Sequence, residues 1–275
     1  MKNKSMKSII VLIFILMLIT CMKGNKDMGI KFNDTNEQVI EWSNTQSAYS
    51  STSTIMFWVD LEAVSVAGHE LNLFRLHNDN VSSNIGYAVQ FIRSDSALYA
   101  NRFRFFRGWS GSSGGAGIWN FQHSTGLQHI AITYDDNSAA NDPIIYVNGV
   151  TQTLTESTAP SGTKVPIAST AFFSIGDPGS ATTSKSFKGT ISSFVIYNRI
   201  FTAAEVMNAY TSRKLIPSYN GLIFAPSLTA PAGGLADEAT MAAGNTILDI
   251  ATGSIGVPGG SPVFKANTLL TLGGE

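Results

Sequence analysis

Apolar and polar residues alternate with a period of two along much of the chain between residues 29 and 198. The clearest runs begin at His129, Ile144 and Phe187, and each is bounded by Asn, Gly, Asp or Ser. Alternation with such boundaries is typical of half-buried antiparallel strands. We therefore predict strands at residues 29–33, 37–42, 54–61, 71–76, 87–93, 97–106, 128–134, 144–148, 150–155, 170–175 and 190–198.

Two local signals add a hairpin and a helix to these strands. Asn148 and Gly149 separate two apolar runs, and both residue types accept the positive φ of a type I′ turn. Thr202 and Glu205 have the spacing of a capping box, which predicts a short helix that ends near Tyr210. Strands followed by one terminal helix indicate a β-sandwich closed by a helix.

The same region resembles the C-terminal half of laminin-G-like jellyroll domains, which belong to the concanavalin A-like lectin and glucanase family. The matching positions are His129, Tyr134, Asp135, Tyr146, Asn148, Gly149, Gly176, Phe187, Gly189, Ile191, Tyr197, Asn198, Arg199 and Glu205. Upstream, residues 29–33, 38–41 and 54–59 resemble the opening strands of the family, so the resemblance covers residues 28–211. It implies an all-β, antiparallel β-sandwich jellyroll with one short C-terminal helix and an irregular tail. Because this fold hosts lectins, adhesion modules, enzymes and scaffolds, the resemblance alone leaves the function open.

The N-terminus has the pattern of an export signal. Lys2, Lys4 and Lys7 precede an unbroken apolar stretch at residues 9–19, which is shorter than the roughly 20 residues of a membrane-spanning helix. We expect four segments along the chain: a signal peptide at 1–21, a tether at 22–28, the jellyroll domain at 29–214, and a C-terminal extension at 215–275. The extension would pack on the domain or on a partner subunit.

Cys21, the only cysteine, ends the apolar stretch. Its surroundings resemble a bacterial lipobox, in which the cysteine is lipidated, and the alternatives are ordinary signal cleavage or a short retained anchor. We therefore expect a secreted or cell-envelope protein whose contact with a membrane is limited to such an anchor. Charged residues make up only 13% of the chain and the net charge is −1, which argues against nucleic acid as a partner.

Hydrolysis of glycosidic bonds is not favoured by the sequence. Glucanases of this fold carry a Glu-x-Asp-x-Glu strand, whose carboxylates act as nucleophile and acid/base. The nearest fragment here contains Asp60 and Glu62, but Trp58 occupies the leading position. We therefore predict a protein that binds rather than catalyses.

Residues 107–120 form a stretch rich in Gly and Ser, which we interpret as a loop between two strands. Flat rings stack on the apolar faces of sugars, while Arg and Asn side chains bind sugar hydroxyls. The predicted ligand-binding residues in and beside this loop are Trp109, Trp119, Arg104, Arg107 and Asn120. The alternative is that Trp119 begins the next strand and packs inward. Trp58 is expected to be a core residue.

The resemblance also implies a structural calcium ion, since many members of the family carry one. Calcium prefers several oxygen ligands at loop tips, and the corresponding residues here are Asp34 and Asp177. Clusters at residues 78–80 and 135–137 are rival positions, although Asp and Asn also cap turns without any metal. No other cofactor is expected.

Together these features predict a non-catalytic extracellular recognition module that binds a glycan or a protein partner. One alternative is a structural subunit of a surface filament or a virion, in which the apolar tail mediates oligomerisation. The second alternative is a divergent glycoside hydrolase.

Overall fold

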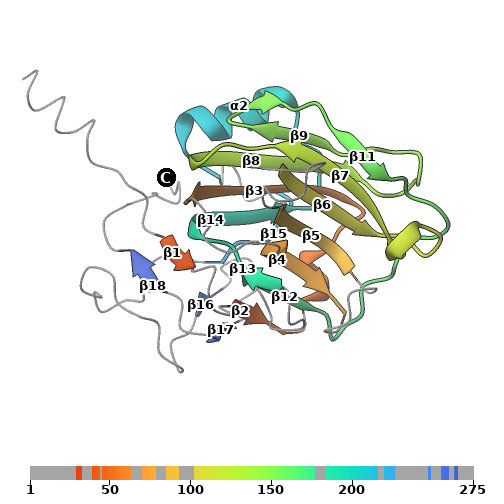
Figure 1. Ribbon diagram of the computed structural model, residues 1–275, viewed down its shortest axis with the longest axis horizontal. Helices are drawn as coiled ribbons and strands as arrows, with labels where there is room; N and C mark the ends of the chain where they lie inside the picture. Colours follow the sequence, from red (N-terminus) through yellow and green to blue (C-terminus); the bar gives the residue numbers. More distant parts are fainter. Residues whose placement is uncertain are drawn as a thin grey trace, which may run out of the picture.

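Two β-sheets stacked face to face form the protein, which Figure 1 shows as a computed structural model. The structure describes residues 29–32, 39–43, 45–62, 70–78, 85–92, 102–176, 184–215, 220–226, 247–248, 255–259 and 263–265. The all-β antiparallel sandwich with one short helix confirms the predicted fold class.

The first sheet, called sheet A, is antiparallel throughout its described strands. Its order is β10 (Val150–Thr151), β9 (Ile144–Val147), β8 (Gly126–Asp135), β3 (Thr52–Leu61), β14 (Gly189–Tyr197), β1 (Gly29–Phe32) and β18 (Val263–Lys265). Strand β15 (Leu222–Phe224) also pairs with β14. The longest pairing joins β3 to β8 and runs from Thr52 opposite Asp135 to Leu61 opposite Gly126.

The second sheet, called sheet B, holds the remaining described strands. Its order is β11 (Thr155–Thr158), β7 (Ala116–Gln122), β6 (Arg102–Gly108), β5 (Ile85–Ile92), β4 (Glu70–His77), β12 (Phe172–Gly176), β2 (Val39–Trp42), β17 (Ile255–Gly259) and β16 (Ile247–Leu248). Strand β13 (Ser184–Ser186) pairs with β4 in parallel, whereas the other pairings are antiparallel. Two short 3-10 turns, η1 (Gln46–Ala48) and η2 (Ser113–Gly115), connect strands.

The alternation along β3 explains why sheet A has two buried faces. Ile55, Phe57 and Val59 belong to the main core between the sheets, where Phe57 meets Phe74 of sheet B edge to face at 5.7 Å between ring centroids. Trp58, at an intervening position, belongs to a second, smaller core on the other face. Because successive side chains of a strand point to opposite faces, one strand supplies both cores.

Helix α2 (Ala203–Ser212) covers the outer face of sheet A near β8 and β9, as Figure 1 shows. The predicted capping box is confirmed: the Glu205 backbone N–H donates to Thr202 Oγ1 at 3.3 Å, and the Thr202 N–H donates to Glu205 Oε2 at 2.8 Å. The helix ends at Arg213, whose backbone is left-handed and whose N–H donates to the Tyr210 carbonyl. Its buried residues Val206 and Ala209 complete the second core.

The predicted loop at residues 107–120 is wrong in its extent. Strand β6 continues to Gly108 and β7 begins at Ala116, so the connection is much shorter than expected. The glycines at positions 114, 115 and 117 obscure the alternation, but Trp119 and Phe121 are inward-facing core residues. The alternative in which Trp119 packs inward is therefore the correct one.

The predicted strand at 150–155 divides between the two sheets. Val150 and Thr151 pair with β9 of sheet A, whereas Thr155 begins β11, which pairs with β7 of sheet B. The chain crosses between sheets here, so a single strand cannot continue. After residue 214, the described strands β15, β17 and β18 pair with β14, β2 and β1, so this part of the C-terminal extension packs on the domain itself.

The predictions for the N-terminus concern residues that the structure does not describe. The signal peptide at 1–21, Cys21 and the tether at 22–28 all lie outside the described residues. Within the described ranges, no helix combines the length and the apolar character needed to cross a bilayer.

Candidate functional site

The structure does not place the predicted ligand-binding residues on a common surface. Trp109 is only 3% exposed, Trp119 is 1% exposed, and Asn120 is fully buried. The Trp119 ring stacks on Phe105 at 5.9 Å and its Nε1 donates to Asp142, while the Asn120 amide donates to the Thr155 carbonyl. The two tryptophans therefore have no free ring face for a sugar, and the prediction that they form a stacking platform is wrong.

Arg107 and Arg104 also have local partners. Arg107 is fully buried, and its Nε donates to Asp136 Oδ2 at 2.5 Å. Asp136 accepts further bonds from Tyr49 Oη at 2.9 Å and from Lys164 Nζ at 3.1 Å. Because Arg107 lies in sheet B and Asp136 follows a strand of sheet A, this pair joins the two sheets. Arg104 is half-buried over the Phe106 ring.

The predicted calcium ligands Asp34 and Asp177 lie outside the described residues. Over the described ranges, no group of three or more His, Cys, Asp or Glu residues is placed to hold a metal ion. Calcium therefore stays a prediction.

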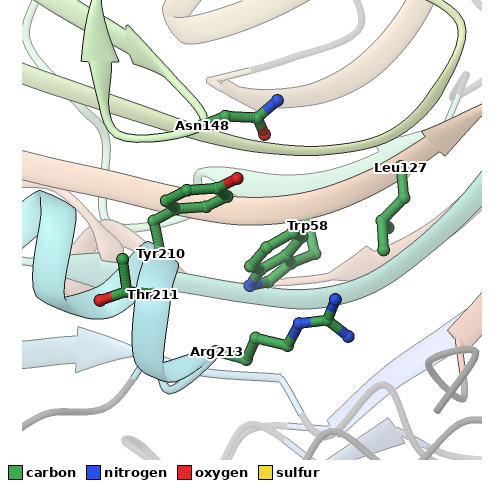
Figure 2. A pocket seen from close by; sticks show the side chains of 6 residues that line it. All are labelled: Trp58, Leu127, Asn148, Tyr210, Thr211 and Arg213. Atoms are coloured by element: carbon green, nitrogen blue, oxygen red, sulfur yellow. The ribbon is translucent and has the colours of Figure 1, made fainter. Parts of the chain in front are cut away.

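A cleft of about 500 Å³ lies elsewhere, where α2 ends beside the outer face of sheet A. Figure 2 shows the side chains around it, and the six residues that line it are Trp58, Leu127, Asn148, Tyr210, Thr211 and Arg213. They come from β3, β8, the β9–β10 turn and the last turn of α2. The volume lies within the roughly 300–1,000 Å³ that is usual for small-molecule sites.

The base of this cleft is aromatic. The side chains of Trp58 and Tyr210 lie next to each other in the cleft (Figure 2). Their rings are stacked, with centroids 5.9 Å apart and planes 26° from parallel. His129 lies beside both rings, 5.2 Å from Trp58 and 6.0 Å from Tyr210. Trp58 is only 3% exposed and so forms the floor, whereas Tyr210 is half-buried and offers ring surface to a ligand.

The cleft base is also uncharged near neutral pH. His129 is fully buried, and neither ring nitrogen has a hydrogen-bond partner among the described residues. Burial lowers the pKa of His129 to about 3, so the imidazole is neutral at pH 7. Arg213 is then the only charged residue among the six that line the cleft.

Asn148 is held at the rim of the cleft by the hairpin turn that the sequence predicts. It has a positive φ of 52°, its backbone N–H donates to the His129 carbonyl at 2.8 Å, and its Oδ1 accepts from the His129 N–H at 2.9 Å. The neighbouring Gly149 lies under the helix, since a Cβ there would meet Met207 at 2.9 Å. The turn thus fixes the Asn148 amide and allows α2 to approach the sheet.

Arg213 lies on the opposite side of the cleft from Asn148 (Figure 2). Its side chain is exposed, and the guanidinium carbon lies 5.9 Å from the centre of the Trp58 ring. Among the described residues it forms no ion pair. The cleft therefore combines two stacked rings, one of which carries the Tyr210 hydroxyl, with an amide and a cation.

Sequence reasoning identified the burial of Trp58 but not the cleft above it. The available signal was the alternation of β3, which places Trp58 on the face opposite Phe57 and Val59. That face meets the helix that ends near Tyr210. The contact between β3 and α2 joins residues about 150 positions apart, so no local pattern predicts it.

Residues 34–207 match the sequence profile of the concanavalin A-like lectin/glucanases superfamily. This match spans more than half of the chain, and the protein therefore belongs to that superfamily. Among curated proteins, no sequence matches this chain.

Two solved structures are similar to this chain but distant from it in sequence. The chain is similar to a "putative carbohydrate binding protein" from Bacteroides ovatus, with 14% identity and a TM-score of 0.57, over 90% of this chain. The chain spans 62% of the length of that protein. It is also similar to a heptameric SAP-like pentraxin from Limulus polyphemus, with 12% identity and a TM-score of 0.48, over 86% of this chain and 96% of the pentraxin. At 14% identity, the similarity to the Bacteroides ovatus protein shows the fold alone.

Proposed function

We propose that the domain is a non-catalytic recognition module that binds carbohydrate in the cleft beside α2. The observation that carries this proposal is the half-buried Tyr210 ring, stacked on Trp58 at the base of an open cleft. A ring of this kind can take the C–H face of a sugar, while Asn148 and Arg213 can donate hydrogen bonds to its hydroxyls. Membership of a superfamily that includes lectins supports the same proposal.

The composition of the cleft supports binding rather than hydrolysis. Retaining glycosidases need two carboxyl groups about 5–5.5 Å apart on either side of the bond that is cleaved. None of the six lining residues is Asp or Glu. The nearest sequence match to a catalytic strand contains Glu62, which here forms an ion pair with Lys31 at 3.2 Å.

A glycan array followed by calorimetry on the full chain tests the proposal. Tyr210→Ala removes the ring and should abolish binding of any glycan that the array identifies, whereas Tyr210→Phe keeps the ring and should retain most of it. Leu127→Arg gives a second test, because Leu127 is 38% exposed at the rim and a larger side chain there would block the cleft without removing an aromatic core residue.

Asn208→Ala is the matched control, since Asn208 is exposed on the same helix and does not line the cleft. Circular dichroism would establish that each variant is folded. A blank array for the unmodified chain would overturn the proposal, and so would glycan binding that folded Tyr210→Ala and Leu127→Arg variants both retain. Release of reducing ends from a bound glycan would contradict its non-catalytic part.

A further inference from the structure

We propose that the cleft selects an acidic sugar, and that Arg213 binds the carboxylate of that sugar. This inference rests on the proposed function, because it names the class of glycan that the same cleft would take. Two other arginines are neutralised locally: Arg107 pairs with Asp136 at 2.5 Å, and Arg199 pairs with Glu205 at 2.7 Å. Arg213 has no carboxylate partner among the described residues, although it borders a cleft.

The Trp58 ring positions the guanidinium without consuming its donors. The guanidinium carbon lies 5.9 Å from the ring centre, within the range of a cation–π contact. Such a contact uses the face of the guanidinium, so its N–H groups stay available for hydrogen bonds. A carboxylate matches this set of donors because two parallel N–H···O bonds can form.

The end of α2 carries partial negative charge, which by itself would repel an anion. Arg213 directly follows this end of the helix, so its cation offsets that partial charge where the carboxylate would lie. One terminal carbonyl, that of Tyr210, also accepts a hydrogen bond from the Arg213 backbone N–H at 3.3 Å.

The other lining residues suit the remainder of an acidic monosaccharide. Leu127 and the Tyr210 ring offer apolar surface for C–H groups, and Asn148 brings an amide whose Oδ1 is held by the His129 N–H. Burial keeps His129 neutral, with a pKa of about 3, so the cleft holds a single positive charge at pH 7. One cation with no carboxylate partner in the described part of the chain favours a ligand that carries one negative charge.

The test compares sugars that differ only in charge. The methyl glycosides of glucuronic acid and of N-acetylneuraminic acid, each beside its own methyl ester, are titrated into the full chain by calorimetry or by NMR. We expect at least one acid to bind about tenfold more tightly than its ester, since a hydrogen-bonded charge pair contributes more than a neutral hydrogen bond. The preference should decrease in high salt.

Arg213→Gln removes the charge and should abolish the preference while leaving the weaker binding of the ester. Lys214→Gln is the matched control, because Lys214 is the adjacent exposed cation and does not line the cleft. It should leave the preference unchanged. A preference that persists in folded Arg213→Gln protein would overturn the inference.

The same titration separates this inference from the proposed function. If neutral sugars bind in a Tyr210-dependent manner but acids show no advantage, the carboxylate assignment is wrong and the binding function stands. If methyl glucoside 6-sulfate binds through Arg213 but neither carboxylate does, the assignment to a carboxylate is likewise wrong. If no sugar binds at all, both proposals are overturned.

Discussion

The imidazole of His129 lies against the indole of Trp58, with ring centroids 5.2 Å apart, and is fully buried beneath the cleft. This burial lowers the pKa of His129 to about 3, whereas an unfolded histidine titrates near 6.5. Between these two pH values the unfolded chain binds a proton that the folded protein does not. Stability therefore falls as the pH decreases through 6.5 toward 3.

We predict that His129→Phe, which keeps an aromatic ring but cannot be protonated, removes this part of the pH dependence. A pH of 5 is 1.5 units below the unfolded value, so His129 should cost about 2 kcal/mol there relative to pH 7. Urea unfolding of both proteins at pH 7 and pH 5 measures the difference. An equal stability gap between the two proteins at both pH values would contradict the prediction.

The ion pair of Arg107 with Asp136 leads to a second prediction. Both side chains are fully buried, so Asp136→Ala leaves the guanidinium buried without its partner and should cost about 3–5 kcal/mol. The pair of Lys31 with Glu62, whose side chains are 33% and 32% exposed, is the control, since Lys31→Ala should cost less than about 1 kcal/mol. Denaturant unfolding measures both costs. Similar losses in the two variants would mean that the buried pair does not hold the sheets together.

The sequence predicted the sandwich because its strands depend on local alternation and on turn residues. The pairing of β3 with β8, the turn at Asn148 and the helix that begins after Thr202 all lie where these signals indicate them. The predicted binding loop was wrong for a related reason. Glycines interrupted the alternation beside Trp119, so a core strand had the composition of a flexible loop.

The cleft could not be predicted in the same way. Trp58 and Tyr210 meet only because α2 packs across sheet A, and the register of that contact is set by three-dimensional packing rather than by a sequence pattern. The same holds for Arg107. Its sequence neighbourhood suggested an exposed ligand-binding cation, whereas its partner Asp136 lies 29 positions away at the end of a strand in the opposite sheet.

A third prediction concerns Gly189, which begins β14 with a φ of 147°. A Cβ at this position would lie 2.1 Å from the Asp60 carbonyl oxygen, an atom of the neighbouring strand that cannot move without disturbing the sheet. We expect Gly189→Ala to cost more than about 3 kcal/mol, since it combines an unfavourable φ with overpacking.

Gly114→Ala provides the comparison for this variant. Gly114 also has a positive φ, of 71°, but nothing lies within 4 Å of a Cβ there. Gly114→Ala should therefore lower the free energy of unfolding only by the strain of a left-handed alanine backbone, about 1–2 kcal/mol. Thermal and urea unfolding of the two variants would show the difference. Equal costs would mean that sheet A relaxes around the added methyl group.

The last prediction links the capping box to the cleft. Thr202 accepts a hydrogen bond from the Glu205 N–H at the start of α2, and the same helix carries Tyr210 and Thr211 at its other end. Thr202→Ala should lower stability by about 1 kcal/mol, whereas Thr202→Ser keeps the capping oxygen and should cost less. Because the last turn of α2 packs on Trp58, we expect fraying to begin at the first turn and binding in the cleft to change less than twofold.

Hydrogen exchange of the α2 amides in the two variants would show where the helix opens. Faster exchange at Tyr210 than at Glu205 in Thr202→Ala would contradict this, because it would mean that the cap at the first turn, rather than packing on the sheet, holds the cleft wall.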